Sequence, residues 1–217
     1  MSKKIAVILS GCGVFDGAEI HESVCTLLAI DKAGASSVCF APNINQHHVI
    51  NHITGEEMAE QRNVLIESSR IARGAINDLA DFDADDFDAV ILPGGFGAAK
   101  NLSSFAFDGA EATVNDDVKT ALQAMKRANK PIGALCISPA VLAAVFGDVN
   151  VTIGTDEPTI AEIEACGAQH SESAHEQIII DAAHKIVTSP CYMLDASIKQ
   201  IAIGAEKTVN ALLDLAA

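Results

Sequence analysis

The chain has 217 residues, of which 49% are hydrophobic, and a formal net charge of −15 at pH 7. A chain of this size forms one sizeable core, so we expect a single domain over residues 1–217. Because no basic stripe offsets the acidic charge, nucleic acids and anionic membrane surfaces are not expected partners.

Short apolar runs alternate with longer amphipathic stretches along the chain, which is typical of βαβ units around a mostly parallel sheet. The expected strands are residues 5–10, 37–41, 89–92, 131–135, 151–153, 178–181 and 186–188. The expected helices are residues 19–33, 117–128 and 196–215. In the first of these, Ile20, Val24, Leu27 and Leu28 predict one buried apolar face before a stop at Gly34.

Two stretches interrupt this alternation. Residues 43–88 contain a polar, histidine-rich part, a helical pattern and an acidic string, and are interpreted as an insertion that serves function or an interface. Residues 97–115 are expected to fold over the carboxyl edge of the sheet.

The localisation signals and the cysteines point to the cytoplasm. No apolar run approaches the roughly 20 residues that cross a bilayer, and the start reaches Gly11 too soon for a signal peptide. The six cysteines form no CxxC pair and are interpreted as reduced thiols. His47, His48 and His52 lack a thiol or carboxylate at a familiar metal spacing, so no metal site is expected.

The segment from Ala134 to Pro139 has the pattern of a nucleophile elbow, a tight strand-to-helix turn that presents one reactive side chain. Cys136 ends an apolar run, Ala134 and Ser138 are small enough for close chain approach, and Pro139 fits a first helical turn. A helix N-terminus beside the thiol is expected to favour the thiolate. The alternative is a buried cysteine that ends a strand, which is also the interpretation of Cys191 after the last strand.

Ligands of open parallel sheets bind beyond the carboxyl ends of the strands. There, Gly94, Gly95 and Gly97 could be ordinary turn residues, but beside an elbow they can direct a backbone N–H at an oxyanion. Ile137 N–H, directly after the cysteine, is the expected second donor. The order of these glycines matches neither the dinucleotide fingerprint nor the phosphate loop.

A reacting thiol also needs a group that exchanges protons with it. Glu19 and Glu22 are three residues apart and share one face of the first expected helix, so either could point at Cys136. The alternative is that both are solvated carboxylates in the first helical turn, where they favour the helix dipole.

Several long motifs together resemble one known superfamily, that of PfpI protease and the Parkinsonism-associated deglycase. They are residues 17–24, the Pro93-Gly94-Gly95 turn, residues 134–139 and Thr188-Ser189-Pro190. Residues 10–14, 49–52, 93–102 and 152–156 resemble more narrowly the ElbB-type glyoxalases, also described as isoprenoid-biosynthesis or sigma cross-reacting proteins. The resemblance implies an α/β three-layer sandwich that is flavodoxin-like and class I glutamine amidotransferase-like.

The resemblance also implies roles for individual residues. Cys136 would be the nucleophile and Glu22 its partner carboxylate, with Glu19 as helper and oxyanion donors at Gly95 and Ile137, next to Gly94. The implied activity is a cysteine-dependent glyoxalase of the hydro-lyase type that converts glyoxal, or methylglyoxal, to the hydroxy acid without glutathione, metal or other cofactor. A homodimer is the implied assembly.

Two other roles stay open. A cysteine in contact with a glutamate can form a stable oxidised state, which would suit a non-enzymatic stress or redox sensor based on Cys136. An accessory role in isoprenoid biosynthesis is implied by the names within the group. Related proteases and amidotransferases tend to carry histidine at the position of Ile137, so amide hydrolysis ranks below glyoxalase activity.

Overall fold

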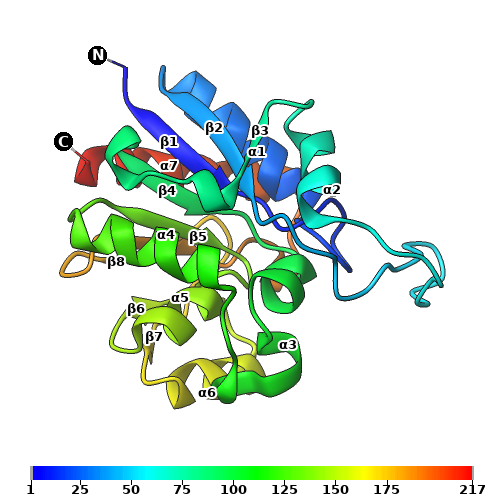
Figure 1. Cartoon of the computed structure of the whole chain (residues 1–217). Helices are drawn as coiled ribbons and strands as arrows, with labels where there is room; N and C mark the ends of the chain where they lie inside the picture. The colour runs from blue at the N-terminus through cyan, green and yellow to red at the C-terminus, as the bar shows by residue number, and fades with distance from the viewer. Residues whose placement is uncertain (1, 217) are drawn as a thin grey trace.

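The computed structural model describes residues 2–216, which form one central sheet covered by helices on both faces (Figure 1). Its strand order is β3-β2-β1-β4-β5-β9-β8, parallel except for the β8–β9 pair. The strands are β1 (Lys4–Ile8), β2 (Ser36–Ala41), β3 (Ile76–Asp78), β4 (Ala89–Leu92), β5 (Ile132–Leu135), β8 (Ile179–Asp181) and β9 (Ile186–Ser189). A separate parallel pair is formed by β6 (Asn150–Val151) and β7 (Gln169–His170).

The helices complete a three-layer arrangement. One face of the sheet carries α1 (Ile20–Lys32), α2 (Val64–Ile71) and α7 (Ile198–Leu215), and the other carries α4 (Asp116–Arg127) and α5 (Pro139–Phe146). The shorter α3 (Phe105–Asp108) and α6 (Glu157–Ala165) lie beside α5. Single turns cover Leu79–Asp81, Ala84–Asp86, Ala98–Leu102, Gly109–Glu111 and Cys191–Met193. The predicted α/β, flavodoxin-like three-layer fold is confirmed.

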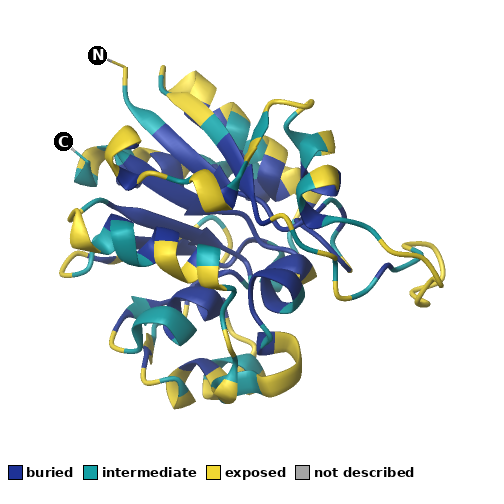
Figure 2. Cartoon of the chain, in the orientation of Figure 1, coloured by how far each residue is buried: buried dark blue, intermediate teal, exposed yellow. Residues whose placement is uncertain are grey.

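Residues 43–88, which were expected to form one insertion, contain two parts with different structures. Figure 2 shows an exposed excursion that precedes α2, whereas the segment after α2 returns to the sheet as β3 and pairs with β2. The sequence pattern did not predict β3, because its three residues include the polar Asn77 and Asp78 and form only an edge strand. The excursion of residues 44–62 is therefore the part that extends from the fold.

Helix α1 reverses the predicted orientation of its faces. The expected apolar face is outside, where Ile20, Val24 and Leu28 are 43%, 49% and 52% exposed. The buried face contains Glu22, Ser23, Thr26, Ala29 and Ile30. Small and polar side chains face inward because α1 packs closely against α7 and against the turns at the carboxyl edge of the sheet. The apolar spacing identified the helix correctly, but the prediction of its buried face was wrong.

Hydrophobic packing holds the sheet between these layers. Strand residues such as Ile5, Val7, Ile91 and Leu135 pack under α1 and α7, and Val90, Leu92 and Ile132 pack under α4 and α5. These strands are buried on both faces, as continuous apolar runs predict for a parallel sheet. No helix within residues 2–216 combines the length and the apolar character needed to cross a bilayer.

Candidate active site

The candidate site lies at the carboxyl ends of β1, β4, β5 and β9. In this sheet β1 lies beside both β2 and β4, so the strand order reverses at the β1–β4 pair, where open α/β sheets bind ligands. The four turns that follow these strands are linked by backbone hydrogen bonds, among them Glu19 N–H to Gly94 O at 2.8 Å and Cys136 N–H to Ser189 O at 2.9 Å. Sequence segments that are far apart therefore meet at one edge.

Cys136 lies on a nucleophile elbow. Its φ of 59° is in the left-handed region, which costs a non-glycine residue conformational energy and is held here by the surrounding turns. The Ser138 hydroxyl donates to Pro93 O at 2.7 Å and so joins the elbow to the turn after β4. Helix α5 begins at Pro139, as the sequence predicts. Cys136 itself is 7% exposed.

Glu22 is the carboxylate that reaches the thiol. The Cys136 thiol and the Glu22 carboxylate lie beside each other around Gly94, and each affects the pKa of the other. Two backbone amides fix this carboxylate, since Gly94 N–H donates to Oε2 at 2.9 Å and Tyr192 N–H donates to Oε1 at 3.2 Å. Glu22 is fully buried on the inner face of α1. The turns after β4, β5 and β9, which carry Gly94, Cys136 and Tyr192, surround its carboxylate and set its orientation.

Burial sets the protonation of this pair. It raises the pKa of Glu22 to about 7, with a contribution from the negative charge of Glu19, while the amides of Tyr192 and Gly94 lower it. Burial also raises the pKa of the Cys136 thiol, and the charge of Glu22 acts in the same direction. Burial and the charge of Glu22 therefore act against the thiolate that the helix N-terminus was expected to favour. The thiol lies beside a carboxyl group whose pKa is raised to about 7.

The glycine turn after β4 allows the close approach of Glu22 and Cys136. A Cβ atom on Gly94 would lie 2.4 Å from Cys136 Cβ and 2.8 Å from Glu22 Oε2, so only glycine fits there. Gly95 has a φ of 96° and directs its N–H at the Cys136 sulfur. The N–H of Ile137 has no acceptor among residues 2–216. The expectation that these two amides donate to an oxygen on a carbon that bonds the sulfur stays a prediction.

Glu19 caps the helix that carries Glu22, and its predicted role as helper stays a prediction. Its carboxylate accepts from Glu22 N–H at 2.6 Å and so caps the N-terminus of α1. The cap holds the first turn of the helix that carries Glu22, and its charge raises the pKa of that residue. Glu19 therefore acts on the thiol only through Glu22.

A cavity of about 380 Å³ opens over the sulfur. It is lined by Val14, Gly95, Phe96, Cys136, Ile137, Asp156, Thr159, Tyr192 and Met193. No histidine of residues 2–216 lines this cavity or bonds to the Cys136–Glu22 pair. Asp156 is occupied as the cap of α6, where its Oδ2 accepts from Thr159 N–H at 3.1 Å. The lining from α6 and the Tyr192 amide had no recognisable pattern in the sequence.

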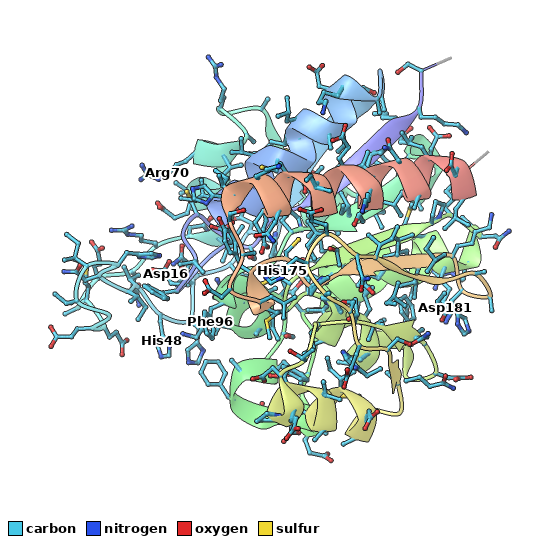
Figure 3. The ribbon with its side chains drawn as sticks, turned by 180° about the vertical axis from the view of Figure 1, so that it is seen from behind. Asp16, His48, Arg70, Phe96, His175 and Asp181 are labelled. Carbon is cyan, nitrogen blue, oxygen red and sulfur yellow. The ribbon has the colours of Figure 1, made fainter. Side chains whose placement is uncertain are left out.

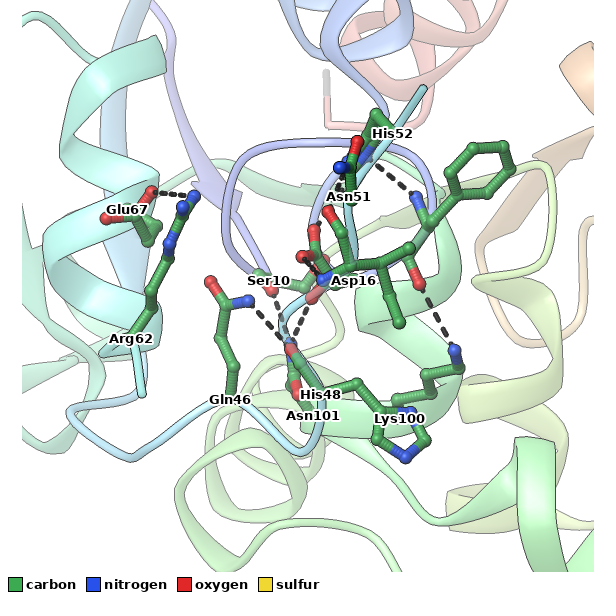
Figure 4. Close-up of polar contacts among 12 residues, drawn as sticks. Ser10, Asp16, Gln46, His48, Asn51, His52, Arg62, Glu67, Lys100 and Asn101 are labelled. Carbon is green, nitrogen blue, oxygen red and sulfur yellow. Dashed lines mark hydrogen bonds and ion pairs between the residues drawn. The ribbon is translucent and has the colours of Figure 1, made fainter. Parts of the chain in front are cut away.

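A polar network supports the site from the side of the excursion (Figure 4). Asn101 Nδ2 donates to Ser10 O and to Asp16 O, both at 2.9 Å. Asp16 Oδ2 accepts from Ile50 N–H at 2.7 Å, and the Phe15 N–H donates to His52 Nε2 at 3.2 Å. These bonds fix the turn after β1 to residues 44–62 and thereby support the glycine turn packed on it.

Figure 3 shows that Asp16, His48 and Phe96 gather at the carboxyl edge of the sheet, whereas Asp181 lies at the opposite end. His47, His48 and His52 lie in the excursion, and His47 and His52 take part in the polar network that supports this edge. Within residues 2–216, no group of three or more His, Cys, Asp and Glu side chains is arranged to hold a metal ion.

Comparisons with known proteins agree with the fold. The profile of the DJ-1/PfpI family matches residues 4–192. The human mitochondrial protein called glutamine amidotransferase-like class 1 domain-containing protein 3 is 43% identical over 222 residues, which cover 98% of this chain and 83% of the human protein. Because that relative is named as mitochondrial, the expectation of a cytoplasmic location stays a prediction.

Two solved structures show how close the architectures are. An isoprenoid biosynthesis protein with an amidotransferase-like domain from Ehrlichia chaffeensis is 36% identical and superposes with a TM-score of 0.91, covering 97% of this chain and 99% of its own. Glyoxalase III from Candida albicans has a TM-score of 0.62 at 16% identity, covering 96% of this chain and 97% of its own. The second likeness shows the fold alone.

Proposed function

We propose that this chain, which belongs to the DJ-1/PfpI family, is a glyoxalase that converts glyoxal to glycolate without glutathione, with Cys136 as nucleophile and Glu22 as proton carrier. One observation carries the proposal: a buried thiol on a strained elbow lies beside a buried carboxyl group whose pKa is raised to about 7. A pKa near the working pH suits a group that must both accept and return a proton.

The first step forms a carbon–sulfur bond. The Cys136 sulfur attacks one aldehyde carbon of glyoxal while the ionised Glu22 accepts the thiol proton, so no standing thiolate is needed. Negative charge moves to the aldehyde oxygen, where we expect the N–H groups of Gly95 and Ile137 to stabilise it. Return of the proton to that oxygen completes the hemithioacetal.

The second step moves one proton between the two carbons. Glu22 removes the hydrogen from the carbon bonded to sulfur and delivers a proton to the neighbouring carbon, while the hydroxyl proton passes to the oxygen of that neighbouring carbon. The hemithioacetal thereby becomes a thioester of glycolate. Water then attacks the thioester carbonyl, releases glycolate and restores the thiol. The sum is glyoxal plus water to glycolate, with no change in the oxidation state of the enzyme.

Amide hydrolysis is less well supported by the same site. A leaving amine must receive a proton, and in cysteine hydrolases a histidine usually supplies it. In this chain the position after the nucleophile is Ile137, and no histidine of residues 2–216 bonds to the thiol or to Glu22. Addition to an aldehyde releases no amine, so the available groups suffice.

The proposal is tested by glycolate formation from glyoxal without glutathione. We expect Cys136→Ser and Glu22→Gln each to lose turnover by at least about 10²-fold, the scale of a removed nucleophile or general base. Cys25→Ser is the matched control, because Cys25 is half-buried on α1 and does not line the cavity. Equal rates in wild type and both site variants would contradict the proposal.

A role in isoprenoid biosynthesis is a second candidate, supported by the name of the Ehrlichia chaffeensis protein and its TM-score of 0.91. It is tested by isoprenoid output in a strain that lacks this chain, complemented by wild type or by Cys136→Ser. Rescue by wild type alone would link that role to the thiol, and unchanged output in the deletion strain would remove it.

We also propose a homodimer that uses the outer face of α1. Ile20, Val24 and Leu28 form an exposed stripe with helical spacing, and an apolar helix face of this kind favours burial against a partner. The same helix carries Glu22 on its inner face, so contact between two copies would fix the helix that positions the carboxyl group.

A further inference from the structure

Cys191 is a second buried thiol at the carboxyl edge, and the proposed glyoxalase steps leave it without a role. It is 6% exposed and directly precedes Tyr192, whose amide holds Glu22. Its φ of 42° lies in the left-handed region, as does that of Cys136 at 59°. Strain of this kind in a non-glycine residue persists only where the surroundings impose it, and it gathers at functional sites.

The strand register brings the turns that carry the two cysteines together. Leu135 of β5 pairs with Ser189 of β9, and Cys136 N–H donates to Ser189 O at 2.9 Å. Both cysteines follow these neighbouring strands, Cys136 at the elbow and Cys191 at the start of the single turn Cys191–Met193. The charge of Cys191 raises the pKa of the Cys136 thiol, so the two sulfurs are within electrostatic reach of each other.

Both thiols lie on the same side of the sheet and near the same carboxyl group. Cys136 and Cys191 belong to the one hydrophobic cluster under α1 and α7. The Glu22 carboxylate lies beside Cys136 and accepts from the backbone amide next to Cys191. The charge of Glu22 also raises the pKa of the Cys191 thiol, after burial as the larger cause, which shows that the carboxylate is within electrostatic reach.

From this arrangement we propose that Cys191 captures an oxidised Cys136, so that peroxide converts the pair into an internal Cys136–Cys191 disulfide. The disulfide would block the nucleophile and at the same time protect it from irreversible oxidation. This inference does not depend on the glyoxalase activity, because it follows from the placement of two sulfurs and one proton carrier.

The chemistry balances with a hydroperoxide as the oxidant. In the first step the peroxide O–O bond breaks, an S–O bond forms on Cys136, and hydrogen peroxide is reduced to water. In the second step the Cys191 sulfur attacks the Cys136 sulfur, the S–S bond forms and the S–O bond breaks. The Cys191 proton passes through Glu22 to the leaving hydroxide. Two thiols and one hydrogen peroxide give one disulfide and two waters.

The remaining cysteines are poorer partners for Cys136. Cys39 is buried in β2, and Cys12 lies in the turn after β1, where the charges of Glu67 and Arg70 influence its thiol. Cys166 follows α6 and donates weakly to Ala110 O at 3.7 Å. Cys25, on α1, is the nearest competitor, since its charge also acts on Cys191.

The test is mass analysis of the full chain after hydrogen peroxide at neutral pH, with remaining thiols blocked and peptides mapped without reduction. In wild type we expect the loss of two hydrogens, one cross-linked peptide that joins Cys136 to Cys191, and complete reversal by dithiothreitol. In Cys191→Ala we expect Cys136 to gain two oxygens that dithiothreitol does not remove. Cys25→Ser should behave like wild type.

The proposal is overturned if wild-type Cys136 gains oxygens without the cross-link, stays unmodified, or joins another cysteine. Cys191→Ser is the second variant, because serine fills the same space and its folding is checked by thermal unfolding before oxidation. The wild-type peptide map decides the question even if neither variant folds. The glyoxal assay is separate from this readout, so failure of one proposal does not decide the other.

Discussion

The inner and outer faces of α1 carry opposite chemistry. The inner face places Glu22, Ser23 and Thr26 against the sheet and the site, whereas the outer face leaves Val24 and Leu28 exposed to solvent. A helix that served stability alone would have the reverse arrangement. Polar residues inside and apolar residues outside agree with the two proposals, in which one face serves the reaction and the other contacts a second copy of the chain.

The inner face depends on close contact with the turn after β4, and Gly94→Ala breaks that contact. The added methyl group would lie 2.4 Å from Cys136 Cβ and 2.8 Å from Glu22 Oε2, so the two groups must separate. We expect glyoxal turnover to fall on the order of 10²-fold, as misplacement of about 1 Å costs in other sites. Steady-state glycolate formation measures the effect.

Gly34→Ala is the control for this change. Gly34 follows α1 with a φ of 71° and no atom within 4 Å of its added Cβ, so the substitution strains the backbone without crowding any neighbour. It should lower stability by about 1 kcal/mol and leave turnover unchanged. Comparable activity loss in both variants would show that the space at Gly94 has no special importance.

The buried charge on the inner face has a cost that depends on pH. Because the pKa of Glu22 is about 7 in the folded chain and ordinarily 4.5, ionisation of Glu22 disfavours the folded state. This loss of unfolding free energy is absent below pH 4.5. It grows between the two pKa values and is fully present above about pH 7. Between pH 4 and 8, wild type should therefore lose about 3 kcal/mol of unfolding free energy that Glu22→Gln retains.

Urea unfolding of both proteins at several pH values measures this difference. The informative quantity is how the difference in unfolding free energy between the two proteins changes with pH. Glutamine at position 22 has a single acceptor oxygen, so it leaves either Gly94 N–H or Tyr192 N–H without an acceptor at every pH. A constant gap from pH 4 to 8 would mean that Glu22 titrates normally in the folded chain, and would remove the basis for its role as a proton carrier near pH 7.

The local parts of the site could be predicted from the sequence, because their residue types are demanded by backbone geometry. The elbow at Cys136 and the turn at Gly94 and Gly95 are such features, and the alternating pattern predicted the layers that hold them. The choice of Glu22 over Glu19 came only from the resemblance, since both share a helix face. Glu19 caps α1 whereas Glu22 lies beside Cys136, and this difference depends on contacts with turns that are distant in the sequence.

The errors have a common physical origin in tertiary contacts. Apolar spacing in α1 predicted a buried face at Val24 and Leu28, whereas the interior selects the small and polar side chains that fit against α7 and the catalytic turns. The helix N-terminus predicted a thiolate at Cys136, but desolvation and the charge of Glu22 raise its pKa. The cavity lining from α6 depends on packing that no local motif records.

The cap at Glu19 links the start of α1 to the reaction, and its loss should have a smaller effect than loss of Gly94. Glu19→Ala removes the acceptor of Glu22 N–H and should lower stability by about 1 kcal/mol. Glu19→Gln keeps an acceptor and removes the charge that raises the pKa of Glu22. In that variant the rise of kcat/KM with pH should move to lower pH, whereas an unmoved profile would contradict the electrostatic role.

The outer face is tested by Val24→Lys, which should have the smallest effect on a single folded chain. Val24 is 49% exposed, so a lysine there removes little buried area and should change monomer stability by less than about 0.5 kcal/mol. Two copies that meet through this stripe would instead bury two unpaired charges, which is strongly unfavourable. Sedimentation velocity should therefore show a dimer for wild type and a monomer for the variant.

Thr120→Lys is the matched control, because Thr120 is exposed on α4, which covers the opposite face of the sheet. It should remain a dimer although its change in charge is the same. If Val24→Lys becomes monomeric and keeps its turnover per chain, the outer face serves assembly alone; if turnover falls as well, assembly also holds Glu22 in place through the helix. A wild-type chain that sediments as a monomer would contradict the dimer and leave the exposed stripe without the partner that its composition indicates.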